Sequence, residues 1–246
     1  METSTRFRDH LIYWILPFSA VLLCILIYFF NWLNASEFIS PSVNREFGIL
    51  ENLQVLILLI IFFISVRAAF YKENKLEKWL FAFIAVLSIF FLLEEIDYGL
   101  HFYDLVTGRQ GEDKAYIIGG EEKIRNIHST GKNTSILKMI SYVIVGLLMV
   151  ILPLLPKKIK QRNSFIAYIS PSKYIVLTAI ALVVINQIAF FIYAPNTHTN
   201  RSLDSNVSEF EELMFYYIVL LYIWEMASKE KTLPINFNRY RNIDNP

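Results

Sequence analysis

Long apolar runs separated by short polar segments dominate this chain and predict its helices. Six runs are long enough to cross the ~30 Å hydrocarbon core of a bilayer at ~1.5 Å of rise per residue. Because a segment inside lipid must satisfy its own backbone hydrogen bonds, each run is expected to be a helix. The predicted spans are Leu11–Leu33, Phe47–Phe70, Trp79–His101, Thr134–Leu155, Tyr174–Tyr193 and Phe210–Ala227. The pattern therefore predicts an all-α, polytopic membrane bundle that forms a single domain over residues 1–246.

The distribution of Lys and Arg predicts how this bundle is oriented. Fifteen of these residues fall on the side that holds both chain ends, and eight fall on the other side. Cytoplasmic loops carry the excess of positive charge, so both termini are predicted to be cytoplasmic. The long loop of residues 107–133, which carries His128, is then extracytoplasmic. The expected location is the cell membrane, crossed several times, with a bacterial inner membrane as the favoured case.

Composition agrees with a membrane protein and argues against several other classes. Hydrophobic residues make up 55% of the chain and charged residues only 18%, which is more apolar than a soluble domain. The formal net charge of +1 gives no support for binding nucleic acid. The single cysteine, Cys24, excludes a disulfide within one chain. No Ser or Cys nucleophile motif and no Gly-rich phosphate loop is visible in the sequence.

Carboxyl and imidazole side chains gather where the third apolar run ends. Glu94, Asp97, His101 and Asp104 follow an i, i+3, i+7, i+10 spacing and so would share one face of a continued helix. The C-terminal end of a helix is the negative end of its macrodipole, where acids are unfavourable. We expect the cost to be offset by a metal ion, by a His or Arg from another segment, or by protonation of the acids.

The adjacent residues Glu94 and Glu95 are expected to play different roles. They diverge by ~100° on a helix, so only one of them can point squarely into a site shared with other helices. Glu94 continues into the polar stripe and is expected to be the more exposed. Glu95 shares its face with Phe91, Leu92 and Phe102. It is therefore expected to be more buried, and to be held neutral or bound to metal.

The predicted topology brings acids of other spans to the same level of the membrane. Glu51 lies at the outer start of the second span and Glu212 at the outer start of the sixth. Acids in the first turn of a helix are favoured by the dipole, which is a sufficient explanation without any chemistry. Glu212 is the stronger candidate, because a carboxylate further inside a span normally faces protein or water. Glu51, Glu95, Glu212 and the loop residue His128 are predicted to form one constellation.

Three short motifs contain most of these candidate residues. They are Arg45-Glu46-Phe47-Gly48-Ile49-Leu50-Glu51-Asn52-Leu53-Gln54, Glu94-Glu95-Ile96-Asp97-Tyr98-Gly99 and Asn126-Ile127-His128-Ser129. They resemble the Glu-x-Gly-x-x-Glu-x-x-Gln, Glu-Glu-Ile-Ser-Trp-Gly-Gln and Asn-Leu-His-Asn motifs of a widespread family of uncharacterised bacterial polytopic membrane proteins. The chain departs from those motifs at Phe47, Asp97, Tyr98, Leu100 and Ser129. The resemblance implies that Glu51, Glu94, Glu95 and His128 belong to one site, and it supplies no reaction.

Two characterised superfamilies are weaker analogies. The CAAX-protease and bacteriocin-processing family also uses a Glu-Glu pair with later histidines, but it expects Arg where Gly99 stands here. The alkaline-ceramidase-like membrane hydrolases bind zinc with several histidines, and their His-x-x-x-His pair is absent from this chain.

One class of function that fits these residues is an enzyme. His101, His128 and a carboxylate such as Glu95 would hold a divalent metal such as zinc, which activates water. A further carboxyl group among the candidates Glu51, Glu94, Glu95 and Glu212 would act as general acid or base. The expected reaction is that of a hydrolase or transferase. Its substrate would be a lipid, a lipid-linked glycan or a membrane peptide that reaches the site from the outer leaflet.

The competing class is a membrane subunit without enzymatic activity. Such a subunit would conduct protons or cations, or would bind another membrane protein, because buried acids serve ion pathways equally well. An ion pathway needs polar residues across both leaflets, whereas the inner halves of the predicted spans are nearly all apolar, with Glu225 as the main exception. In both classes the expected partners are membrane lipids, with a lipid-linked substrate or another membrane protein, and not nucleic acid.

Overall fold

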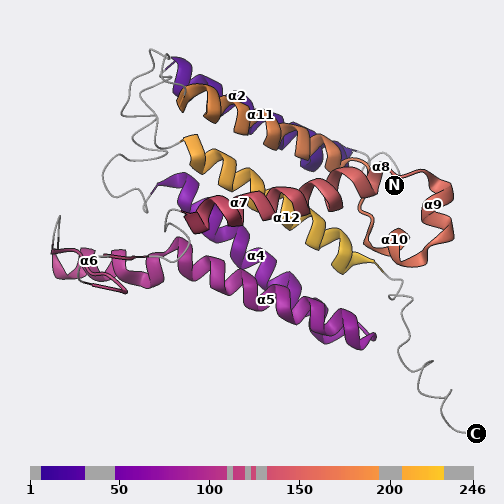
Figure 1. The fold of residues 1–246 in the computed structure, drawn as a ribbon, viewed down its shortest axis with the longest axis horizontal. Coiled ribbons are helices and arrows are strands. Elements are labelled where there is room, and N and C mark those ends of the chain that lie inside the picture. Colours follow the sequence, from indigo (N-terminus) through magenta and orange to yellow (C-terminus); the bar gives the residue numbers. More distant parts are fainter. Residues whose placement is uncertain are drawn as a thin grey trace, which may run out of the picture.

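Helices that run along the long axis of the molecule make up most of the fold (Figure 1). The computed structural model describes residues 7–30, 48–109, 113–119, 123–125, 132–193 and 207–229. Within these ranges, regular structure is helical apart from one isolated bridge between Ile118 and Ile124. The all-α prediction is therefore confirmed for the part of the chain that the structure describes.

The helices follow the predicted spans closely. They are η1 (Leu11–Ile15), α2 (Leu16–Phe30), α4 (Ile49–Tyr71), α5 (Lys75–Glu95), η4 (Asp97–Gly99), α6 (Leu100–Thr107), α7 (Lys132–Val145), η6 (Gly146–Ile151), α8 (Leu152–Leu154), α9 (Lys157–Arg162), α10 (Ser164–Ile169), α11 (Ile175–Tyr193) and α12 (Val207–Ser228). Three helical stretches in the described ranges are long and apolar enough to cross a membrane: Phe7–Ile27, Ile49–Tyr71 and Lys75–Glu95. The chain is thus a membrane protein, and a count of six crossings stays a prediction.

Helix α12 lies between two groups of helices and contributes to both hydrophobic cores. One core joins η1, α2, η6 and α11 to α12, with Cys24 and Ile218 among its buried residues. The other joins α4 and α5 to α12, with Phe81 and Ile223 among its buried residues. Lipid tails are as apolar as these side chains, so close packing holds such helices together more than the hydrophobic effect does. Helix α12 therefore packs against both groups of helices and joins them.

Two prolines coincide with local widening of the helices. The Leu16 N–H bonds to the Leu11 carbonyl just before Pro17, and the Leu152 N–H bonds to the Leu147 carbonyl just before Pro153. A proline lacks an N–H, and its ring crowds the carbonyl four residues earlier. The preceding turn accommodates this by widening to π-helical geometry, with hydrogen bonds that span five residues.

The third predicted span is broken before it reaches His101. Helix α5 ends at Glu95, and the short turn η4 leads into α6. Asp97, Tyr98 and Gly99 have φ angles of 46°, 54° and 82°. These angles lie in the left-handed region, which a right-handed helix does not contain. The prediction that Glu94, Asp97, His101 and Asp104 share one face of a continuous helix is therefore wrong.

Gly99 is expected to stabilise this break, because it adopts a positive φ angle without strain. Replacing Gly99 by Ala should destabilise the fold by about 1–2 kcal/mol, because a side chain in the left-handed region is strained. No heavy atom lies within 4 Å of the added Cβ, so the cost is conformational rather than steric. Gly146→Ala in η6 is the control, since its Cβ also meets nothing and alanine favours helix by up to about 1 kcal/mol. Thermal unfolding in micelles should shift in opposite directions, and shifts of the same sign would contradict the argument.

Polar contacts link the helices at one end of the bundle. This end holds η1, α9 and α10, and we call it the basic end. Glu225 of α12 accepts hydrogen bonds from the Tyr13 hydroxyl and, at 2.6 Å, from the Ser172 N–H. Lys229 donates to the Ser170 carbonyl at 2.9 Å. The first described helix and the last one are therefore joined at the same end of the molecule. Glu225, the inner polar exception in the sequence, is engaged in these contacts.

Candidate functional site

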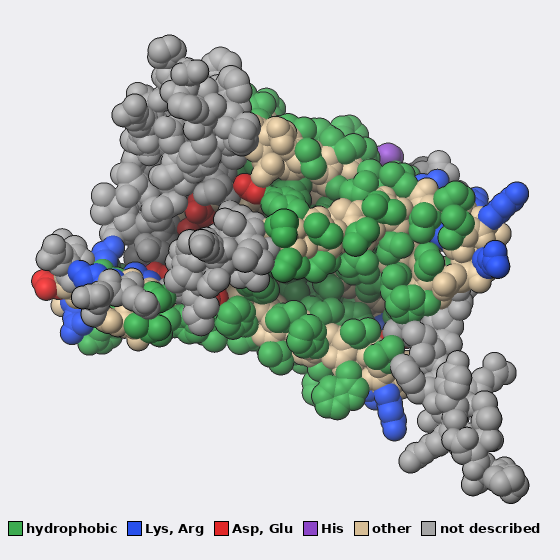
Figure 2. All heavy atoms as spheres, in the orientation of Figure 1, with side chains coloured by type: hydrophobic (Ala, Val, Ile, Leu, Met, Phe, Trp, Pro, Cys, Tyr) green, Lys and Arg blue, Asp and Glu red, His purple; other side chains and the backbone are tan. Residues whose placement is uncertain are grey.

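A groove of about 410 Å³ runs along α12 between α5 and α7. Its walls are mostly apolar and include Leu58, Phe91 and Met149. Its volume is within the range of ligand-binding pockets, about 300–1,000 Å³. Figure 2 shows the apolar surface along the body of the bundle and acidic side chains toward the end opposite the basic end. We call that end, formed by the start of α4 and α12 and the end of α5, the acidic end.

Glu95 lies in the lining of the groove, and its neighbour Glu94 does not. The Glu95 carboxylate accepts a hydrogen bond from the hydroxyl of Tyr216 on α12. Glu94 is only 1% exposed and accepts a hydrogen bond from the Tyr98 hydroxyl. The prediction that Glu94 is exposed and Glu95 more buried is therefore wrong. Tyr98 in the helix break bonds back to Glu94, and the groove leaves Glu95 partly exposed.

Carboxyl groups from three helices interact with one another at the acidic end. Glu51 of α4 and Glu95 of α5 both interact with Glu209 and Glu212 of α12. The interaction between Glu51 and Glu209 brings α4 and α12 into contact at this end. The structure thus brings Glu51, Glu95 and Glu212 together, and their membership of one functional site stays a prediction. His128, the fourth predicted member, lies outside the described residues.

Buried amide and hydroxyl groups hold the α12 acids in place. Gln54, which is fully buried, donates to the Glu209 carboxylate and to the Glu209 carbonyl, both at 3.1 Å. Glu211 accepts hydrogen bonds from the Tyr142 hydroxyl of α7 and, at 2.9 Å, from the Asn186 amide of α11. The first turn of α12 is therefore connected to α4 on one side and to α7 and α11 on the other.

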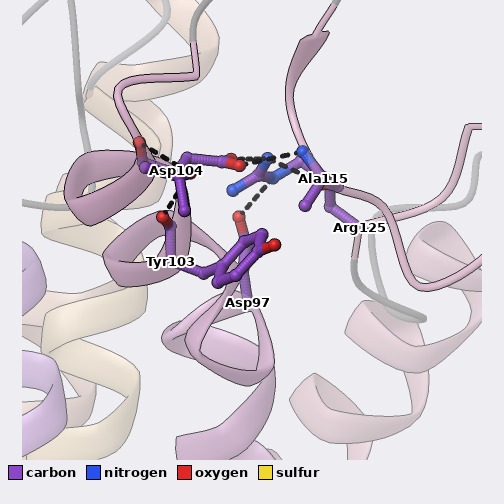
Figure 3. A network of polar contacts seen from close by, with 6 residues as sticks. Asp97, Tyr103, Asp104, Ala115 and Arg125 are labelled. Carbon is purple, nitrogen blue, oxygen red and sulfur yellow. Dashed lines mark hydrogen bonds and ion pairs between the residues drawn. The ribbon is translucent and has the colours of Figure 1, made fainter.

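Arg125 joins Asp97, in the helix break, to Asp104 of α6, and Figure 3 shows this arrangement, which we call the Arg125 clamp. The Nε atom of Arg125 donates to Asp97 at 2.9 Å, and its Nη1 atom donates to Asp104 at 2.7 Å. Nη1 also donates to the Ala115 carbonyl at 3.0 Å, and the Ala115 N–H donates to Asp104 at 2.9 Å. Both Asp side chains are buried at 5% exposure. The partner required by these acids is thus an Arg from another segment, one of the predicted possibilities.

Within the clamp, the charged forms of Asp104 and Arg125 are favoured. Burial alone would raise the pKa of Asp104, but hydrogen bonds from Arg125 and Ala115 and the charge of Arg125 hold that pKa below its ordinary value. Burial alone would lower the pKa of Arg125, and the two carboxylates more than reverse this effect. Arg125 and Asp104 therefore form an ion pair that holds the loop at Ala115 against α6.

The described residues do not complete the predicted metal site. His101 is buried in α6 at 6% exposure, with its ring centroid 4.1 Å from that of Phe102. Among the described residues, no group of three or more His, Cys, Asp or Glu side chains is placed to hold a metal ion. The predicted ligand set of His101, Glu95 and His128 includes a residue outside the described ranges, so zinc binding stays a prediction.

Comparisons with family models, curated proteins and solved structures gave no match. The resemblance to the bacterial family therefore rests on its motifs alone. The sequence patterns give no role to Arg125, Tyr142 or Tyr216, and Gln54 enters only as the last residue of a motif. Gln54 lies three residues after Glu51 and Tyr216 four residues after Glu212, so helical spacing was an available signal for both. Nothing in the sequence distinguishes Arg125 from the other basic residues of the loop.

Proposed function

We propose that this protein binds the apolar chain of a membrane lipid or lipid-linked substrate in its groove and acts on the headgroup with the carboxyl groups at the acidic end. In this proposal the chain crosses the cell membrane six times, with both termini in the cytoplasm and the acidic end at the outer leaflet. The contact between Tyr13 and Glu225 joins the start of the first helix to the end of the last one. Chain ends on the same side of a membrane require an even number of crossings, so this contact supports an even number. The groove is the observation that carries the proposal.

The shape of the groove suits an extended apolar chain. Glu212 and Ile223 both line it and are eleven residues apart on α12, which corresponds to about 16 Å along a helix. Leu87 of α5 and Ile144 of α7 line its two sides and are 37% and 49% exposed. The groove is therefore open between α5 and α7, on the side where lipid surrounds the bundle. An amphiphile would enter from the bilayer and leave its headgroup at the acidic end.

The chemistry at the headgroup would be proton transfer by carboxyl groups. A protonated carboxyl group donates its proton to the leaving oxygen, and a carboxylate removes a proton from water or from an acceptor hydroxyl. Paired carboxyl groups perform this task in glycoside hydrolysis. Glu95 and Glu212 line the groove and are the candidates for these two roles, and both interact with Glu51. The reaction class is hydrolysis or transfer at the headgroup.

A divalent metal such as zinc would add a second source of activated water. His128 would have to supply a ligand, together with His101 and a carboxylate such as Glu95. Elemental analysis of purified protein separates the two mechanisms. If the wild-type protein holds about one equivalent of zinc and His128→Ala loses it, the metal belongs to the proposed site. If the wild-type protein holds no zinc, the carboxyl mechanism stands alone.

Photo-crosslinking tests the occupant of the groove. A phospholipid with a diazirine at the end of an acyl chain should, in nanodiscs, label residues deep in the groove such as Met149 and Ile223. Ile144→Trp narrows the mouth of the groove and should reduce this labelling at least fivefold. Val143→Trp is the matched control, because Val143 is 55% exposed on the same helix and lies outside the lining. Equal labelling in the two variants would overturn the proposal.

The alternative is a membrane subunit that binds lipid or a partner protein without catalysis. It would show the same labelling of the groove but no turnover of any outer-leaflet lipid or lipid-linked glycan. The contacts of Glu225 at the basic end give no support to an ion pathway through the bundle, because that carboxylate is engaged with Tyr13 and Ser172.

A further inference from the structure

Helix α6 has its polar side chains inside and its apolar side chains outside. His101 and Asp104 are buried at 6% and 5% exposure, and Asp104 contacts the loop through Ala115 and Arg125. Leu105 and Val106 are 61% and 85% exposed. A helix at the surface of a water-soluble domain shows the reverse arrangement. The surroundings of the exposed face are therefore expected to be apolar.

The position of α6 along the chain places it at the surface of a membrane. Helix α5 has 21 residues and is about 31 Å long, which matches the ~30 Å hydrocarbon core. Helix α6 begins at Leu100, five residues after the end of α5, and lies beyond the ends of the neighbouring helices (Figure 1). The hydrocarbon core is thus already crossed where α6 begins.

The loop held against α6 has a similar surface. Ile117 and Ile118 are 45% and 49% exposed. Tyr103 of α6 is 48% exposed, with the Arg109 guanidinium 5.1 Å from the centre of its ring. Tyrosine, and arginine with its long apolar stem, are both favoured at the boundary between lipid and water.

We propose that α6, with Ile117 and Ile118 of the loop, lies in the headgroup layer of the membrane, with Leu105 and Val106 inserted at the boundary of the acyl chains. The partner of this surface is lipid, not a second protein. Interfacial helices bind membranes in this way, through an apolar face that enters the boundary region. This placement does not depend on the reaction proposed for the groove.

Cysteine variants in nanodiscs test the placement. Val106→Cys is compared with Asp113→Cys, an exposed position of the loop, and with Val86→Cys, which is 67% exposed on α5 within the span. The native Cys24 is fully buried and provides the background. A water-soluble maleimide should react with Asp113→Cys at least tenfold faster than with Val106→Cys. A bimane label at position 106 should be quenched more by a lipid with a nitroxide near its headgroup than by one with a nitroxide deep in its chain, and the label at position 86 should show the reverse.

Two results would overturn the proposal. Reaction of Val106→Cys as fast as Asp113→Cys would mean that α6 lies in water. Slow reaction without quenching by either nitroxide lipid would mean that protein covers this face, either a second copy of the chain or another partner. Failure of the groove labelling would leave both of these measurements unaffected, so the two proposals fail separately.

Discussion

Replacing Arg125 by Met is expected to cost about 3–5 kcal/mol of folding free energy, the largest stability effect in this protein. Arg125 is the shared partner of Asp97 and Asp104, and its removal leaves two buried carboxylates without their counter-charge. Arg125→Lys should recover only part of the loss, because one ammonium group cannot reproduce the two separate donors of the guanidinium. Chemical unfolding in micelles measures the free energy, and limited proteolysis of the loop reports its release from α6.

The matched control for this prediction is Arg109→Met. Arg109 is exposed and contacts the Tyr103 ring, so its loss should cost about 1 kcal/mol or less. Acid should separate the two variants further. Because the folded pKa of Asp104 is lowered, its contribution is present above the ordinary carboxyl pKa and is lost as pH falls through the lowered value. This loss of folding stability at acid pH should persist in Arg109→Met and become smaller in Arg125→Met. An equal loss in the two variants would contradict the role of the clamp.

The largest functional effect is expected from Glu95→Gln. It should lower turnover of the lipid or lipid-linked substrate by about 10²–10⁴-fold, the usual contribution of a general acid or base. Labelling of the groove by the diazirine phospholipid should persist, because glutamine keeps the shape of the side chain. Mass spectrometry of headgroups released from outer-leaflet lipids and lipid-linked glycans measures turnover, and the crosslinking yield measures binding.

Glu94→Gln is the neighbouring control for this experiment. Glu94 is bonded to Tyr98 and does not line the groove, so this change should leave turnover within a few-fold of the wild type. Its cost should appear in stability, at about 1–3 kcal/mol, because a buried hydrogen bond is altered. Loss of turnover in Glu94→Gln with normal turnover in Glu95→Gln would reverse the assigned roles. Equal effects would remove the distinction between them.

The sequence by itself determined which segments form long helices. An apolar run inside lipid has only one way to satisfy its backbone, so composition and length were enough to place α4, α5, α11 and α12 to within a few residues, except where α5 ends. The same reasoning brought Glu51, Glu95 and Glu212 to one level. Glu51 lies in the first turn of α4, Glu95 is the last residue of α5 and Glu212 lies near the start of α12, and these acids interact in the structure.

Only the tertiary structure decided which of the two adjacent acids enters the groove and which group neutralises the buried acids Asp97 and Asp104. Helical periodicity assumes regular φ and ψ, and it fails at Asp97, Tyr98 and Gly99, where φ is positive. The partner of Asp97 is Arg125, 28 residues away, and local sequence carries no information about such a contact. The width of the groove is likewise set by the distance between α5 and α7 along α12. That distance depends on packing between side chains of separate helices, which no pattern within one helix records.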